Sequence, residues 1–334
     1  MLNWPYIAPS WLPGGQTQTI WSALFSCKGR APEDRHRPYR ERWGTPDGDF
    51  VDVDMLHACE HRSGPPVLLC LFHGLEGSMR SHYARALALW AQAQGVDFAL
   101  PHFRGCSGEI NLAPRAYHSG DHEEVAWVLR RLRYRFPAHR IVALGVSLGG
   151  NALMRWAAEA GDEASKMVDA VASVCSPIDL RASGLAIGTG FNRLVYTPMF
   201  LRTMKPKAEQ KWQQYPGLFD LQRMRSSRDL YEFDDVFTGP LHGFAGVEDY
   251  WARASAKPVL DQIRVPALVL NALNDPFVPA ESLPKHVQGD WVQLCQPEHG
   301  GHVGFAAGAW PGHLQAMPEW VGAWLLKSAG LAVR

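Results

Sequence analysis

The most constraining feature of the sequence is a serine between two glycines, at the end of an apolar run. Residues 141–146 are apolar or small, and they lead directly into Gly145-Val146-Ser147-Leu148-Gly149. With a helix expected from about 148 to 160, this order predicts a buried strand, a sharp turn that carries the serine, and a helix. The glycines have a physical reason, because a Cβ at 145 or 149 would collide with neighbouring backbone in so tight a turn.

Strand and helix patterns alternate through most of the remaining chain. Short apolar runs predict further strands over 67–72, 97–103, 170–175, 266–273 and 291–296. Helical spacing of apolar residues predicts further helices over 80–94, 121–136 and 318–328. Strands that alternate with helices form βαβ units around a mainly parallel sheet. The expected fold class is therefore α/β, with helices on both faces of the sheet.

Two segments depart from this alternation. Residues 1–46 carry many prolines, Pro13 and Pro32 among them, which are expected to break any long element, while four tryptophans indicate an N-terminal arm packed on the body. The body is expected over 47–334.

Within the body, residues 178–262 are much longer than a normal connection between two parallel strands, and they are rich in aromatic side chains. We expect a mostly helical lid there, with Phe200 and Trp212 as candidate cavity walls; the alternative is packing remote from any site.

Charge and cysteine content narrow the class of protein. The 334 residues include 33 Lys+Arg and 33 Asp+Glu, so the formal net charge is zero. A chain without excess positive charge is not expected to bind nucleic acid or acidic lipid. The six cysteines, Cys27 among them, are far apart, and Cys70 and Cys175 are expected to be buried thiols rather than disulfide partners. The N-terminus lacks a signal-peptide pattern and no apolar stretch reaches 18 residues. We therefore expect a cytoplasmic protein without an integral membrane segment.

A serine hydroxyl is a weak nucleophile unless a base removes its proton and an acid orients that base. For a strand–turn–helix serine, the expected chain order is serine, acid, histidine. Asp275 follows the strand at 266–273, and His302 follows the strand at 291–296. Both then join Ser147 at the carboxyl ends of parallel strands, where open α/β sheets build their sites. The sequence predicts a Ser147–His302–Asp275 triad.

Other residues compete for these roles. His299 is an alternative base, but the glycines immediately before His302 allow a tight loop to present the His302 ring. The two histidines suggest a metal site, yet no third ligand has suitable spacing, so none is predicted. Ser107 stands in Gly-Cys-Ser-Gly, lacks the second spaced glycine, and is not taken as the nucleophile. Asp275 could also be an ordinary turn residue before Pro276.

Acyl transfer also needs two N–H groups that bind a developing oxyanion. The backbone amide of Leu148 is one candidate, since it follows the serine at a helix N-terminus. The loop His73-Gly74-Leu75-Glu76-Gly77 follows an earlier strand, and the amide of Leu75 is the second candidate. His73 is expected to be structural and to bond neighbouring backbone.

Six motifs together resemble one known family. They are Gln18-Thr19-Ile20-Trp21, His73-Gly74-Leu75-Glu76-Gly77, Phe103-Arg104-Gly105-Cys106-Ser107-Gly108-Glu109, Gly145-Val146-Ser147-Leu148-Gly149-Gly150-Asn151, Phe233-Asp234-Asp235 and His299-Gly300-Gly301-His302-Val303-Gly304-Phe305. The chain resembles the YheT-like α/β-hydrolases, which include predicted bacterial esterases and eukaryotic abhydrolase-domain lipases. The resemblance implies the α/β-hydrolase fold and ester hydrolysis by Ser147, Asp275 and His302. The family often has a second Asp where Asn274 stands. We expect no counterpart of the eukaryotic membrane anchor.

These observations predict a serine carboxylic ester hydrolase, an esterase or lipase, that forms an acyl-enzyme and needs no cofactor or metal. The expected substrate is a small ester with a lipophilic acyl group, and the oligomeric state is left open. An acyltransferase, thioesterase or peptidase would use the same triad. A catalytically silent binding protein of the same fold is an alternative of a different class, against which the three intact side chains argue.

Overall fold

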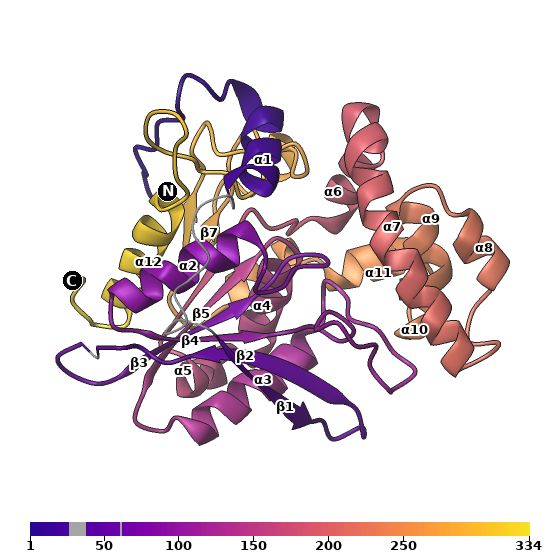
Figure 1. Cartoon of the computed structure of the whole chain (residues 1–334), viewed down its shortest axis with the longest axis horizontal. Coiled ribbons are helices and arrows are strands. Elements are labelled where there is room, and N and C mark those ends of the chain that lie inside the picture. The colour runs from indigo at the N-terminus through magenta and orange to yellow at the C-terminus, as the bar shows by residue number, and fades with distance from the viewer. Residues whose placement is uncertain (27–37, 61) are drawn as a thin grey trace.

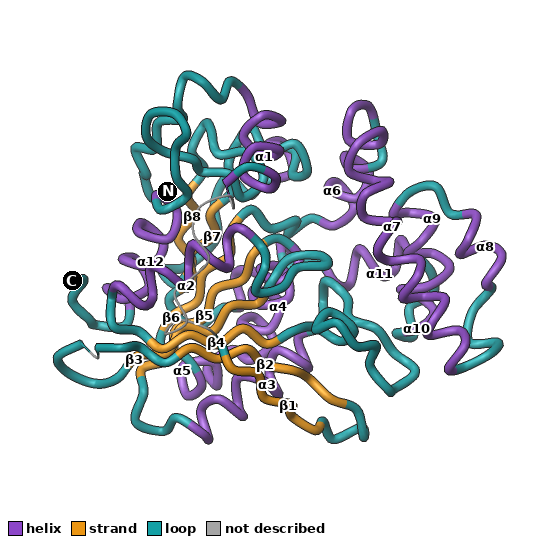
Figure 2. Tube along the Cα trace, in the orientation of Figure 1, coloured by secondary structure: helices purple, strands orange, loops and turns teal. Residues whose placement is uncertain are grey.

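The structure, a computed structural model, describes residues 1–26, 38–60 and 62–334. Within these residues the centre is an eight-stranded sheet of order β1-β2-β4-β3-β5-β6-β7-β8 (Figures 1 and 2). The strands are β1 (Tyr39–Gly44), β2 (Phe50–Leu56), β3 (Val67–Phe72), β4 (Asp97–Pro101), β5 (Arg140–Val146), β6 (Ala170–Val174), β7 (Ala267–Leu270) and β8 (Val292–Cys295). β2 pairs antiparallel with β1 and β4, and every other pair is parallel. The predicted α/β fold class is confirmed.

Helices cover both faces of the sheet, as predicted. One face carries α2 (His82–Ala93) and α12 (Ala316–Ser328), and the other carries α3 (His122–Arg135), α4 (Leu148–Ala160) and α5 (Ala164–Met167) (Figure 1). All six residues of β3 are buried. Burial on both faces explains why the central strands are continuous apolar runs rather than alternating ones.

The ends of the elements differ from the predicted ends by up to three residues. The largest difference is at β7, which was expected to reach residue 273 and ends at Leu270. Beyond it, the Asn271 backbone N–H still donates to the Cys295 oxygen at 3.0 Å, and the Asn271 side chain donates to the Ser176 backbone oxygen at 3.1 Å. The apolar pattern therefore continues past the strand into a loop that is itself packed against the protein.

The expectation that prolines keep the N-terminal arm free of long elements is wrong. Helix α1 (Gly14–Leu24) forms directly after Pro13, which stands at its N-cap. A proline just before or at the first helical turn costs no hydrogen bond, so it marks the start of a helix rather than its absence. In the same N-terminal segment, Trp4 stacks on Trp320 of α12 with ring centroids 4.9 Å apart. Pro32 and Cys27 lie outside the described residues.

Strands β1 and β2 were not predicted, because charged residues interrupt their apolar pattern. Arg40 stands opposite Asp54 and Arg42 opposite Asp52 in the β1–β2 register. Each arginine donates two hydrogen bonds to its aspartate, at 2.7 and 3.0 Å for Arg40 and 2.8 and 2.9 Å for Arg42. Each charge is paired with an opposite charge on the neighbouring strand. The β1–β2 ladder can contain these four residues because they form such pairs.

Residues 178–262, between β6 and β7, form a helical insertion beside the sheet (Figure 1). Its helices are α6 (Leu180–Ile187), α7 (Gly190–Gln214), α8 (Leu221–Ser226), α9 (Leu230–Phe233), the π-helical turn η4 (Asp234–Thr238), α10 (Gly239–Leu241), α11 (Val247–Ala254) and the 3₁₀ turn η5 (Lys257–Gln262). It has its own apolar cluster, which includes Tyr196, Met224 and Phe233. Among the described residues, no helix has both the length and the apolar character needed to cross a membrane.

The stability of the fold is expected to fall on acidification, because burial keeps three histidines neutral. Burial lowers the pKa of His73 and of His118 to about 3, and that of His82 to about 4. An unfolded histidine takes up a proton below about pH 6.5. The stability that these groups contribute is thus complete above that pH and is lost as the pH falls toward their folded pKa values.

Two buried carboxyl groups oppose this trend. Burial raises the pKa of Glu124 to about 7 and that of Asp234 to about 6, so the folded chain holds these two protons at a pH where the unfolded chain has released them. On acidification the unfolded chain takes up three protons at these histidines, whereas the folded chain holds up to two at Glu124 and Asp234. The unfolded chain therefore binds more protons, and we expect the free energy of unfolding to fall by about 1 to 2 kcal/mol per pH unit between about pH 6 and 4. Urea unfolding at a series of pH values measures this slope, and a flat profile would contradict it.

Candidate active site

Ser147 lies in the turn between β5 and α4, with a backbone φ of +53°. A non-glycine residue in this region is strained and persists only where the surroundings hold it. A Cβ on Gly145 would lie 2.4 Å from the Gly149 backbone oxygen, and one on Gly149 would lie 2.4 Å from the His73 backbone oxygen. The predicted steric reason for both glycines is confirmed.

The structure brings the three predicted site residues together at one edge of the sheet. His302 Nε2 lies 3.0 Å from Ser147 Oγ, and His302 Nδ1 lies 2.9 Å from Asp275 Oδ2. The other Asp275 oxygen accepts a hydrogen bond of 2.8 Å from the Phe277 N–H. The Asp275 side chain is fully buried and that of His302 is 12% exposed. Because a carboxylate only accepts, Nδ1 carries the ring proton and Nε2 is left to accept the proton of Ser147.

The competing residues lie elsewhere. His299 is exposed, and its Nδ1 is 3.4 Å from Asn274 Nδ2. In the described part of the chain, His299 has no hydrogen bond to Ser147 or Asp275. Ser107 lines a different pocket, together with Arg40 and Asp54.

The loop after β3 holds one peptide group beside Ser147 in a fixed orientation. The Gly74 carbonyl oxygen accepts hydrogen bonds from the Gly77 N–H at 2.9 Å and from His73 Nδ1 at 2.7 Å. His73 Nε2 accepts the Phe103 N–H at 3.0 Å, so Nδ1 is the protonated nitrogen and donates. In a trans peptide the Leu75 N–H points opposite to this bound carbonyl. A Cβ on Gly74 would lie 3.1 Å from the Ser147 Cβ, which puts the peptide next to the serine.

Comparison with known proteins assigns the chain to a family. A profile of the alpha/beta hydrolase fold family matches residues 67–309. The chain belongs to the α/β-hydrolase family. It is YheT-like: the YheT protein of Escherichia coli (strain K12) is 40% identical over 274 residues, which are 81% of this chain and 79% of that one. The resemblance that the motifs indicated is confirmed.

More distant relatives share the same core. Phospholipase ABHD3 of Homo sapiens is 26% identical over 92% of this α/β-hydrolase and 75% of its own length. Among solved structures, the esterase Pf2001 of Pyrococcus furiosus superposes with a TM-score of 0.54 at 16% identity, covering 90% of this chain and 94% of that one. At this identity the structural likeness concerns the fold.

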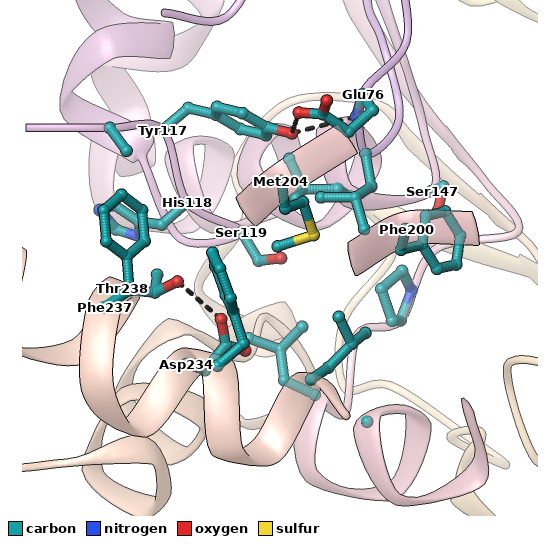
Figure 3. Close-up of a pocket in the computed structure, with 18 of the residues that line it drawn as sticks. Glu76, Tyr117, His118, Ser119, Ser147, Phe200, Met204, Asp234, Phe237 and Thr238 are labelled. Atoms are coloured by element: carbon teal, nitrogen blue, oxygen red, sulfur yellow. Dashed lines mark hydrogen bonds between the residues drawn. The ribbon is translucent and has the colours of Figure 1, made fainter. Parts of the chain in front are cut away.

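A largely apolar cavity opens from Ser147 and His302 of this α/β-hydrolase toward the helical insertion (Figure 3). Apolar side chains of its wall include Leu75, Leu148, Ile187, Phe200, Met204 and Phe237. Phe200 lies where the sequence predicted. Trp212 does not line the cavity; it packs on the insertion's own apolar cluster. Both residues belong to α7, and the sequence does not show which side of that helix faces inward.

Polar side chains at two places in the cavity were not predicted. Glu76 Oε1 accepts hydrogen bonds of 2.8 Å from Tyr117 Oη and from Lys207 Nζ. The Asp234 carboxylate, on the opposite wall, accepts from Thr238 Oγ1 at 2.6 Å and from the Trp251 indole N–H at 2.9 Å (Figure 3). Glu76 and Lys207 are 131 residues apart, so no local pattern could have paired them.

Proposed function

We propose that this α/β-hydrolase is a serine carboxylic ester hydrolase that works through Ser147, His302 and Asp275. The observation that carries the proposal is the continuous hydrogen-bond chain from Ser147 Oγ through both ring nitrogens of His302 to Asp275, at 3.0 and 2.9 Å. A strained serine at a helix N-terminus, a neutral acceptor nitrogen and a buried carboxylate are the parts that nucleophilic acyl transfer requires.

In the proposed mechanism, Ser147 Oγ attacks the ester carbonyl carbon while His302 Nε2 takes the hydroxyl proton. Asp275 stabilises the imidazolium that results. The tetrahedral intermediate collapses to an acyl-enzyme as His302 returns the proton to the departing alcohol. Water then attacks the acyl-enzyme, His302 accepts a proton from the water, and the carboxylic acid leaves as Ser147 is restored.

The oxyanion would bind to the backbone amides of Leu75 and Leu148. Leu148 is the first residue of α4, where N–H groups have no partner within the helix. The Leu75 amide is oriented by the two hydrogen bonds on the Gly74 carbonyl. Donors that are already fixed need no reorganisation as charge develops, and removing one such donor typically costs about 10² to 10³ in rate.

The experiment that tests the proposal follows p-nitrophenyl butyrate with and without an added alcohol such as glycerol. A hydrolase releases p-nitrophenol and free butyrate in equal amounts. Transfer of the butyryl group to glycerol as the main product would favour an acyltransferase. The absence of both turnover and covalent labelling by a fluorophosphonate probe would favour the silent binding protein.

We propose that the helical insertion acts as a lid over the acyl chain of the substrate. The enzyme should then prefer esters with longer acyl groups. Each buried methylene contributes about 0.8 kcal/mol, close to fourfold in kcat/KM when the transition state retains it. From p-nitrophenyl acetate to the butyrate or hexanoate, kcat/KM should therefore rise by about tenfold or more. Steady-state kinetics across the ester series measure this.

Two phenylalanines of α7 supply a matched pair for that series. Phe200 lines the cavity, whereas Phe191 is 49% exposed and does not. Phe200→Ala should reduce the gain per methylene, and Phe191→Ala should leave it as in the unmodified protein. A kcat/KM that is highest for acetate and declines with each added carbon would contradict the lid proposal and leave the triad unaffected.

A further inference from the structure

The loop that carries His302 has a backbone that its own residues do not favour. Gly301, Val303 and Phe305 have φ values of +57°, +58° and +37°. Two of these are non-glycine residues in the left-handed region, and for a β-branched residue such as Val303 this conformation is costly. Local preference therefore does not hold the loop in shape, and contacts from elsewhere in the chain must do so.

Cys175 and His82 supply some of those contacts, to Gly301 and Val303, and helix α1 of the N-terminal arm supplies the ones to Gly300 and His302. Thr19 Oγ1 accepts a hydrogen bond of 2.8 Å from the backbone N–H of His302, from a position 283 residues earlier in the chain. The same hydroxyl donates to the Gly15 backbone oxygen at 2.7 Å. The adjacent Gln18 is 1% exposed, and its Oε1 accepts the Gly300 N–H at 2.9 Å. Two consecutive residues of one helix thus bind the backbone of the loop that presents the histidine.

The same helix reaches the loop of the acid. Gln18 Oε1 also accepts a hydrogen bond of 3.1 Å from Asn274 Nδ2, and Asn274 is the residue before Asp275. Asn274 Oδ1 in turn accepts the Gly301 N–H at 2.9 Å. Helix α1, the Asp275 loop and the His302 loop therefore form one connected set of hydrogen bonds.

The contact is also sterically close. A Cβ on Gly15 would lie 1.8 Å from the Asn274 backbone oxygen. A Cβ on Gly301 would lie 2.7 Å from the Gly15 backbone oxygen and 2.9 Å from Thr19 Oγ1. Helix α1 thus packs directly against the Asp275 loop and the His302 loop. At Gly15 and Gly301 there is no space for a side chain or water between the backbones.

We propose that Thr19 and Gln18 are positioning residues, which fix the His302 ring between Ser147 and Asp275. This inference rests on the proposed function. Neither residue touches the substrate or the reacting atoms; Thr19 acts through the His302 backbone, and Gln18 acts through Gly300 and Asn274. A displacement of a catalytic group by about 1 Å can cost about 100-fold in rate.

The test replaces Thr19 with valine, which has nearly the same shape but no hydroxyl. We expect kcat on p-nitrophenyl butyrate to fall by about tenfold or more with KM within about twofold, because the base is misplaced while the cavity is unchanged. Thr19→Ser retains the hydroxyl and should restore kcat to within about twofold of the unmodified protein. Thr19→Ala removes the same hydroxyl without a new methyl group and serves if the valine variant does not fold.

Thr17 supplies the matched control. Its hydroxyl also bonds a backbone oxygen at the start of α1, that of Pro13 at 2.5 Å, but Thr17 is exposed and, among the described residues, has no hydrogen bond to the His302 loop. Thr17→Val should leave kcat unchanged. A kcat that survives in folded Thr19→Val, or an equal loss in Thr17→Val, would overturn the inference while Ser147-dependent turnover stands. An unmodified protein without turnover or fluorophosphonate labelling would overturn the proposed function and this inference with it.

Discussion

Alanine in place of Ser147 is expected to abolish both ester turnover and covalent labelling by a fluorophosphonate probe. The rate should fall by about 10⁴ to 10⁶, because the atom that attacks the carbonyl is gone while the rest of the site remains. The fold should persist. The serine hydroxyl contacts His302 at the rim of the cavity, and alanine places the same Cβ on the same strained backbone.

Ser107→Ala is the control for this experiment, because Ser107 lies in a different pocket and should be dispensable. Circular dichroism and a urea titration establish that both variants are folded. Labelling that persists in Ser147→Ala would mean that another residue is the nucleophile, and Ser107 would be the first to examine.

His302→Ala and His299→Ala are expected to differ sharply in ester turnover. Removing His302 takes away both the acceptor of the Ser147 proton and the partner of Asp275, so the loss should match that of the serine variant. His299 is exposed, and its Nδ1 lies 3.4 Å from Asn274 Nδ2. His299→Ala should retain measurable turnover, within about tenfold of the unmodified protein.

Single-turnover labelling by the fluorophosphonate probe measures the same difference without a leaving alcohol. The reaction rate should drop in His302→Ala and not in His299→Ala, since Ser147 still needs a base. If His299→Ala were the inactive variant, the roles of the two histidines would be reversed, and the loop would have to adopt another conformation in solution.

Much of this architecture could be predicted from local patterns. The apolar run before Ser147, its two flanking glycines and the helix after it require one strand–turn–helix geometry, because only glycine fits the close backbone approaches at 145 and 149. Asp275 and His302 follow two later strands, and parallel strands end at a common edge of the sheet. Chain order and topology thus suffice to bring the three residues near one another.

Other features escaped prediction because their physical cause is a residue far away in the chain. In the sequence, the segments that form β1 and β2 are charged and do not have a strand pattern. In the structure, Arg40 lies opposite Asp54 and Arg42 opposite Asp52, and each pair is hydrogen-bonded. Local propensity does not contain that information, since the stabilising partner lies on the other strand.

The motif that contains Gln18 and Thr19 was visible in the sequence, but its contacts with the His302 loop were not. Helix α1 itself was not predicted, and a helix pattern in the sequence would still leave open which surface the helix meets. The position of α1 follows from packing, in which Gly15 and Gly301 allow the backbones to touch and the strained loop gains its hydrogen bonds. The same limit applies to α7, whose sequence predicts a helix while its docking turns Phe200 toward the cavity and Trp212 away from it. Local patterns act over a few residues, whereas contacts across 283 residues form only once the whole chain has folded.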